Sequence, residues 1–172
     1  MSKQKAHKVV QVGLGERSYP IRIEKGQLAR IGEDLRQKKI AKRYAVISDD
    51  HVADLYGDRL QNGLTSAGLK SELITFPRGE ESKNLRTLAA LASELARAGF
   101  DRKDGLIALG GGVTGDLTGF LASVYMRGIP FVQVPTTLLA QVDSSVGGKT
   151  GVDIPEGKNL VGAFWQPSGV IC

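Results

Sequence analysis

The chain has 172 residues, of which 41% are hydrophobic and 24% are charged, and its formal net charge is +5. These values are typical of an ordinary soluble globular protein that is long enough to bury a core. No apolar run approaches the roughly 20 residues that span a bilayer, and the polar, basic N-terminus is not a secretory signal. The single cysteine, Cys172, excludes an internal disulfide and fits a reducing cytosol, so we expect a cytoplasmic protein.

Positive charges gather at one place in the first third of the chain, at Arg36, Lys38, Lys39, Lys42 and Arg43. Cations favour helix C-termini, so a solvated helix end is the favoured interpretation. Few aromatic residues interleave with these charges and no nucleic-acid motif is present, which disfavours nucleic-acid binding. A moderate positive field would also attract a small anionic substrate.

The apolar pattern predicts a hairpin followed by alternating strands and helices. Alternating, β-branched runs at 8–14 and 19–24 flank a turn, which is a hairpin signal. Helical spacing predicts helices over 27–38, from Val52 to Gly68 and from Leu85 to Gly99. Short apolar runs predict strands at 43–47, 72–76, 106–109, 131–134 and from Val170 onward. The sequence therefore predicts an α/β, Rossmann-like parallel sheet flanked by helices, with an N-terminal β-hairpin.

The chain shows no internal repeat, low-complexity segment or linker, so we expect residues 1–172 to form one domain. Its last residues, Gly169 to Cys172, begin a predicted buried strand and stop there. Chain termini usually lie at the surface. We therefore expect this domain to come from a longer protein.

A glycine-rich segment, 110–116, directly follows one predicted strand and opens a helix. Its Gly110-x-Gly112-x-x-Gly115 spacing is that of a dinucleotide-binding turn. The glycines let the backbone approach a pyrophosphate, and the helix N-terminus supplies N–H groups and partial positive charge. The acidic residue expected about 20 positions later is missing, so an ordinary Rossmann dehydrogenase fits poorly. A tight turn without a ligand remains the alternative.

Polar and charged residues recur at predicted loop positions after the glycine turn: Arg127, Asp143, Lys149, Lys158 and Asn159. Each one alone suits a solvated surface, but their concentration beside predicted core elements indicates a site. The cations suit a phosphate or a carboxylate. Gly148-Lys149-Thr150 is not the end of a Walker A loop, because residue 143 is Asp where that motif needs Gly.

These motifs together resemble 3-dehydroquinate synthases. They are Gly110–Asp116, Met126–Gly128 and the stretches QVPTTLLA (133–140), VDSSVGGKT (142–150) and GKNLVGAFWQP (157–167). Upstream, Gly79–Lys83 and Ser48–Asp50 extend the resemblance. It covers essentially the whole chain as the family's N-terminal NAD-binding domain, which is roughly half of the full enzyme.

The resemblance implies a lyase of the shikimate pathway, which leads to chorismate and the aromatic amino acids. Such an enzyme converts a small anionic sugar phosphate, 3-deoxy-D-arabino-heptulosonate 7-phosphate, to 3-dehydroquinate and phosphate. NAD transiently oxidises a substrate alcohol, phosphate leaves, the ketone is reduced back, and ring opening and aldol closure follow. A divalent metal, zinc or cobalt, acts as a Lewis acid on the substrate oxygens.

The resemblance also implies roles for individual residues. It assigns NAD binding to Asp49, Glu80, Lys83, Gly111, Gly112, Val113, Asp116, Thr136, Thr137 and Lys158. It assigns the substrate and catalytic cleft to Arg127, Asp143, Lys149 and Asn159. The chemistry agrees, since glycine N–H groups and lysines suit a pyrophosphate, carboxylates suit ribose hydroxyls, and cations suit the substrate's anionic groups.

The family's metal ligands are a glutamate and two histidines of its C-terminal helical domain. This chain has only His7 and His51, without metal-ligand spacing, so we expect no metal site and no synthase turnover in the chain alone. The missing domain would be its main partner, and family members are commonly homodimers. We expect neither nucleic acid nor a membrane as a partner.

Three other interpretations stay open. A related sugar-phosphate cyclase would make a cyclitol instead of dehydroquinate. A metal-dependent alcohol or glycerol dehydrogenase would share this kind of N-terminal domain, although a neutral alcohol needs no cationic cluster. A non-catalytic nucleotide-binding module would expose an apolar face for a docking partner.

Overall fold

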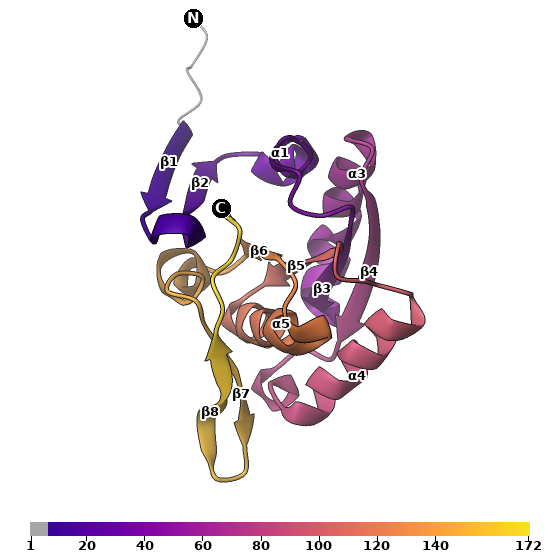
Figure 1. Cartoon of the computed structure of the whole chain (residues 1–172), viewed down its shortest axis with the longest axis vertical. Coiled ribbons are helices and arrows are strands. Elements are labelled where there is room, and N and C mark those ends of the chain that lie inside the picture. The colour runs from indigo at the N-terminus through magenta and orange to yellow at the C-terminus, as the bar shows by residue number, and fades with distance from the viewer. Residues whose placement is uncertain (1–6) are drawn as a thin grey trace, which may run out of the picture.

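The computed structural model describes residues 7–172 (Figure 1). Residues 1–6, which hold most of the polar N-terminus discussed above, lie outside the described part. Seven strands form one sheet in the order β1-β2-β9-β6-β5-β3-β4, and β7 and β8 form a separate two-stranded sheet. The strands are β1 His7–Val12, β2 Tyr19–Glu24, β3 Arg43–Asp49, β4 Lys70–Phe76, β5 Gly105–Gly110, β6 Phe131–Pro135, β7 Lys149–Ile154, β8 Gly157–Phe164 and β9 Val170–Ile171.

Helices cover both faces of the large sheet. They are α1 Ile31–Lys38, α2 Asp50–Val52, α3 Asp58–Ser66, α4 Leu85–Arg97 and α5 Gly112–Val124. On one face, Leu95 of α4 and Leu117 of α5 share a buried hydrophobic cluster with Phe131 of β6. On the other face, Leu35 of α1 and Leu64 of α3 pack with the core of β3, β5 and β6. The predicted α/β Rossmann-like sheet is confirmed.

The order in which the chain adds parallel strands to the sheet reverses between β3 and β5. From β3 the chain crosses to β4 on one side, and from β5 it crosses to β6 on the other. Open α/β sheets bind ligands outside the carboxyl ends of their strands at such a switch point. Asp49 ends β3 and Gly110 ends β5, so both residues lie at the edge where a ligand is expected.

The N-terminal hairpin is confirmed, and the end of the chain holds it to the parallel strands. β1 and β2 are antiparallel and pair from His7↔Glu24 to Val12↔Tyr19. β9 runs parallel to both β2 and β6 and lies between them. Val170 and Ile171 are buried there, as the sequence predicts. No helix within residues 7–172 has the length and apolarity needed to cross a membrane.

Two predicted helices differ from the expectation in detail. The segment expected to be one helix from Val52 to Gly68 contains a wider π-helical turn, η3 Ala53–Gly57, between α2 and α3. The wider turn shifts the helical phase, so Leu55 is 56% exposed while Leu60 and Leu64 are fully buried. The helix expected over 27–38 begins as a 3₁₀ turn, η2 Gln27–Ala29, and becomes α-helical only at Ile31.

The β7–β8 hairpin is the largest departure from the sequence prediction (Figure 1). Lys149, Lys158 and Asn159 were expected at loop positions, and that placement was wrong, because all three lie on its strands. The hairpin packs against α5, where Gly119 permits the approach: a Cβ there would overlap Thr150 Cγ2. The missed signal is Pro155-Glu156-Gly157, a turn sequence between two short β-prone runs.

Candidate functional site

The carboxyl edge of the sheet brings three predicted residues together. Asp49 caps α2, and its Oδ1 accepts a hydrogen bond from Val52 N at 2.9 Å, which fixes the direction of the carboxylate. Thr136 N donates to Gly110 O at 2.9 Å, so the ends of β5 and β6 are joined. Thr137 Oγ1 then accepts from Ala140 N at 3.2 Å and caps the following helical turn. The ends of β3, β5 and β6 thereby form one continuous rim.

The glycine turn opens α5 as the spacing predicts. Gly111 precedes the helix, and no side chain caps the helix N-terminus. The N–H groups of the first turn of a helix have no partner within the helix, so they are donors for an anion. Gly115 serves packing instead, because a Cβ there would lie 2.7 Å from Gln133 Oε1 on β6. The turn is therefore a close helix–strand contact, and it leaves the N-terminus of α5 without a side-chain cap.

A cavity of about 400 Å³ lies between α5, the helical segment after β6 and the β7–β8 hairpin. Four of the predicted site residues line it: Asp116, Asp143, Lys149 and Asn159. They come from α5, from η6 (Ala140–Ser144) and from both strands of the hairpin. The cavity therefore exists only because segments distant in the sequence meet at this side of α5.

A buried lysine links the cofactor and substrate assignments. Lys83 is 5% exposed, and its Nζ donates to Asp116 Oδ2 at 2.6 Å and to Asn159 Oδ1 at 2.6 Å. Charge-assisted hydrogen bonds of this length are among the stronger polar contacts in proteins. An ammonium group has three donors, so one N–H of Lys83 remains for a ligand at this point.

Asp116 is the perturbed acid of the cluster. Burial raises the pKa of its carboxyl group above the ordinary value of 3.8, and the hydrogen bond and charge of Lys83 oppose that rise. Nearby Glu80 and Asp153 raise the pKa further. The Lys83 ammonium is thus the main stabiliser of the ionised carboxylate, and loss of that ammonium would favour the protonated acid.

Glu80 and Lys158 form a second contact between the same two segments. Lys158 Nζ lies 3.0 Å from Glu80 Oε1, and both side chains are largely exposed. The hydrogen bond and charge of Glu80 raise the pKa of Lys158. Exposed pairs of this kind contribute little stability, so both groups are available to a ligand.

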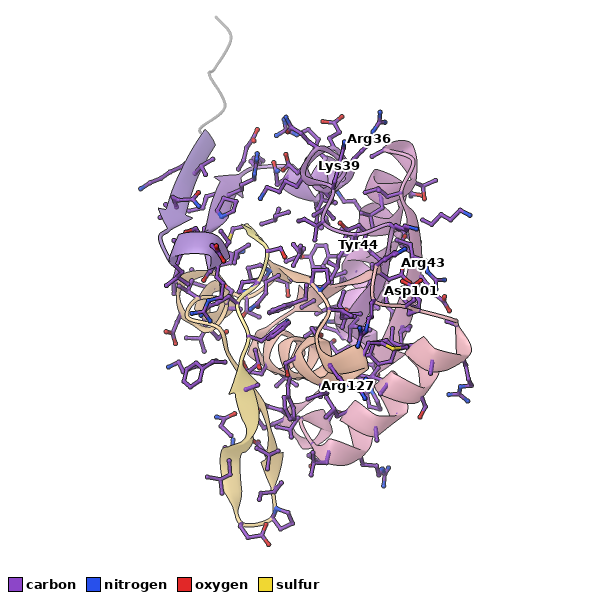
Figure 2. All side chains as sticks on the ribbon, in the orientation of Figure 1. Arg36, Lys39, Arg43, Tyr44, Asp101 and Arg127 are labelled. Carbon is purple, nitrogen blue, oxygen red and sulfur yellow. The ribbon has the colours of Figure 1, made fainter. Side chains whose placement is uncertain are left out.

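Arg127 is not brought into this cluster. It follows the carboxyl end of α5 (Figure 2). The glycine turn stands at the amino end, and a 13-residue helix is about 20 Å long. Arg127 is exposed, does not line the cavity, and has a left-handed backbone with φ of 67°. Its assignment to the substrate cleft stays a prediction.

One residue of the basic cluster at 36–43 has a structural role. Arg43 Nε pairs with Asp104 Oδ2 at 3.0 Å, and its guanidinium lies 4.1 Å from the centre of the Phe100 ring. Arg43 also donates to the carbonyls of Ala98 and Gly99, which follow α4. Figure 2 shows Arg36, Lys39 and Arg43 near α1 and the start of β3. At least Arg43 is therefore a packing residue and not a free cation.

Across residues 7–172, no group of three or more His, Cys, Asp or Glu side chains is arranged to hold a metal ion. Carboxylates are present at the cavity, in Asp116 and Asp143, but no third ligand of these types joins them. The described residues therefore do not fit a resident metal by themselves.

The fold and the site are those of a Rossmann-like α/β protein. A glycine turn lies at the switch point of its sheet, and a polar cavity lies beside that turn. The profile of the family described as 3-dehydroquinate synthase N-terminal matches residues 73–172. The chain belongs to this family. A 3-dehydroquinate synthase from Syntrophotalea carbinolica is 56% identical over 159 residues, which are 92% of this chain and 44% of that protein. The chain thus spans less than half the length of this relative.

Solved structures agree with the fold. A 2-deoxy-scyllo-inosose synthase complexed with carbaglucose-6-phosphate, NAD+ and Co2+ has a TM-score of 0.88 at 30% identity, over 95% of this chain and 44% of that one. ValA, a 2-epi-5-epi-valiolone synthase from Streptomyces hygroscopicus subsp. jinggangensis with NAD+ and Zn2+ bound, has a TM-score of 0.80 at 32% identity. It matches over 93% of this chain and 44% of its own.

Proposed function

We propose that residues 1–172 are the NAD-binding N-terminal part of a cytosolic 3-dehydroquinate synthase. The whole enzyme would convert 3-deoxy-D-arabino-heptulosonate 7-phosphate to 3-dehydroquinate and phosphate. The observation that carries the proposal is the uncapped N-terminus of α5, which stands at the sheet's switch point beside the polar cavity. The family membership and the 56% identity to a 3-dehydroquinate synthase support the choice of reaction.

The residues at the carboxyl edge fit a dinucleotide. Backbone N–H groups at Gly111, Gly112 and Val113 would donate to the pyrophosphate, and the Asp49 carboxylate would accept from a ribose hydroxyl. Bound NAD supplies the hydride acceptor and donor. Lys83 would hold the cofactor with its remaining N–H, and further contacts would come from Glu80, Asp116, Thr136, Thr137 and Lys158. The NAD+ named with two similar structures supports this assignment.

The cavity suits an anionic sugar phosphate. Lys149 and Asn159 line it and would bind the substrate's charged and hydroxyl groups, and the Asp143 carboxylate would orient a hydroxyl. Arg127 is assigned to the same substrate by the family resemblance alone. Because Lys83 contacts Asn159, the substrate side and the cofactor side of the proposed site meet at one ammonium group.

The divalent metal, zinc or cobalt, would take its ligands from outside residues 7–172, since these residues hold no suitable cluster. The helical domain that completes the relatives is the proposed source of those ligands. We assign no catalytic step of this chain to the metal. Homodimer formation by the whole enzyme remains part of the proposal.

Another sugar-phosphate cyclase is the second candidate. Its support is the TM-score of 0.88 with 2-deoxy-scyllo-inosose synthase, although the identity there is 30% against 56% for the dehydroquinate synthase. Turnover of a panel of sugar phosphates by the whole enzyme separates the two candidates, because each would release its own carbocycle.

The proposal is tested by calorimetric titration of the chain with NAD, using Gly112→Asp and, as a matched control, Gly112→Ala. A Cβ at residue 112 would lie 3.3 Å from Ser144 Oγ, so the Cβ that both variants add needs only a small shift of that side chain. Because an added carboxylate repels a pyrophosphate, we expect Gly112→Asp to weaken NAD binding at least about tenfold more than Gly112→Ala does. A folded wild-type chain that shows no saturable NAD binding would contradict the proposal.

A further inference from the structure

Two predicted site residues lie in an irregular part of the β7–β8 hairpin. Pairing is regular from Lys149↔Phe164 to Val152↔Val161, and then Ile154 pairs with Gly157. Between these pairs, Asp153 alone on β7 faces the three residues 158–160 on β8. Bulges of this kind redirect side chains and are frequent beside active sites. Lys158 and Asn159 therefore owe their directions to the irregularity opposite Asp153.

Asp153 closes a ring of three hydrogen bonds. Its backbone N donates to Lys83 O at 2.8 Å, and its Oδ1 accepts from Asn159 N at 2.8 Å. Lys83 Nζ completes the ring by donating to Asn159 Oδ1 at 2.6 Å. Lys83 and Asn159 are thus held to each other directly and also through Asp153.

The backbone of Asn159 explains why this support is needed. Its φ is 57°, in the left-handed region that is unfavourable for residues other than glycine. Asn tolerates this region better than most residues, and a charge-assisted bond from its N–H to a carboxylate favours the conformation further. The carboxylate of Asp153 therefore stabilises the backbone conformation that brings Asn159 Oδ1 to Lys83 Nζ.

We propose that Asp153 is a positioning residue of the site: it holds Asn159 in the left-handed conformation and so sets Lys83 between the cofactor and substrate groups. Asp153 does not line the 400 Å³ cavity, although it lines a second hollow beside Glu80, Lys83 and Lys158. The positioning role rests on its hydrogen bonds to Lys83 and Asn159. The inference rests on the proposed function only where it concerns NAD. The ring itself is a property of the chain.

The test compares Asp153→Ala with Asp153→Asn in the whole chain. Asn keeps an Oδ1 acceptor for Asn159 N–H, whereas Ala removes it. We expect Asp153→Ala to speed hydrogen exchange of the Asn159 amide about tenfold and to weaken NAD binding about tenfold. Both quantities should stay within about threefold of wild type in Asp153→Asn. Asp101→Ala is the control, because Asp101 accepts from Lys103 N at 2.7 Å in an exposed loop (Figure 2). It should change neither measurement.

Each outcome decides the question. Unchanged exchange at Asn159 in Asp153→Ala would overturn the inference, and so would an Asp153→Asn variant as damaged as Asp153→Ala. A lower unfolding midpoint with unchanged NAD affinity in a fully folded sample would also overturn it, since the role would then be only structural. If the wild-type chain binds no NAD, the cofactor assignment fails, and amide exchange at Asn159 alone decides whether Asp153 holds the ring.

Discussion

Replacing Lys83 with Met tests the buried cluster directly. Met has a similar length, so the change removes the charge and both 2.6 Å hydrogen bonds while it fills much of the same space. The Asp116 side chain keeps 21% exposure but loses its cationic partner. Removing one partner of a buried ion pair costs about 3–5 kcal/mol, and the remaining exposure of Asp116 places the expected loss at the lower end, about 3 kcal/mol.

The assay is equilibrium unfolding in urea. With a slope of about 2 kcal/mol per molar urea, the midpoint should fall by about 1.5 M at pH 7. Lys158→Met is the matched control, because Lys158 and its partner Glu80 are largely exposed, and it should leave the midpoint unchanged within error. Asp116→Asn in the Lys83→Met background should restore part of the loss, since it removes the unpaired buried charge.

The pH dependence supplies an independent check of sign. Burial already raises the pKa of Asp116 above 3.8. The hydrogen bond and charge of Lys83 oppose this rise, and Lys83→Met removes both. A carboxyl group whose folded pKa exceeds its unfolded pKa binds more protons when folded, so it favours folding increasingly as pH falls toward 3.8. The loss of stability in Lys83→Met should therefore become smaller as the pH falls from 7 toward 3.8. A variant as stable as wild type at pH 7, or a deficit that grows on acidification, would refute the reasoning.

Two further substitutions test the packing that places the site. Gly119→Val should lower stability by about 1–3 kcal/mol and loosen the hairpin, because a Cβ at residue 119 would overlap Thr150 Cγ2 and lie 3.0 Å from Phe131 Cζ. Gly13→Ala, where no atom lies within 4 Å of the added Cβ, is its control in thermal unfolding. Leu95→Ala should cost about 2–5 kcal/mol because Leu95 is fully buried, whereas Leu138→Ala, at a side chain that is 75% exposed, should have little effect in the same urea assay. Equal midpoints for Leu95→Ala and Leu138→Ala would contradict the assigned core.

The local sequence pattern was enough to predict most strands of the large sheet. The strand at Leu106–Leu109, the turn at Gly110–Gly112 and the helix after it were predicted, because hydrophobic period and glycine chemistry are properties of neighbouring residues. The pattern failed at Leu55, where a π-helical turn changed the phase. It also failed at the β7–β8 hairpin, whose polar residues resemble a loop.

The sequence by itself determined the parallel α/β class, the glycine turn before α5 and the types of residue available for a site. Only the tertiary structure decided which of these residues meet. It placed Lys83 against Asp116 and Asn159, left Arg127 at the far end of α5, and bonded Asp153, which had no assigned role, to Lys83 and Asn159. The physical reason is that such contacts join segments up to 76 residues apart, and their geometry depends on how the hairpin packs on α5 through Gly119.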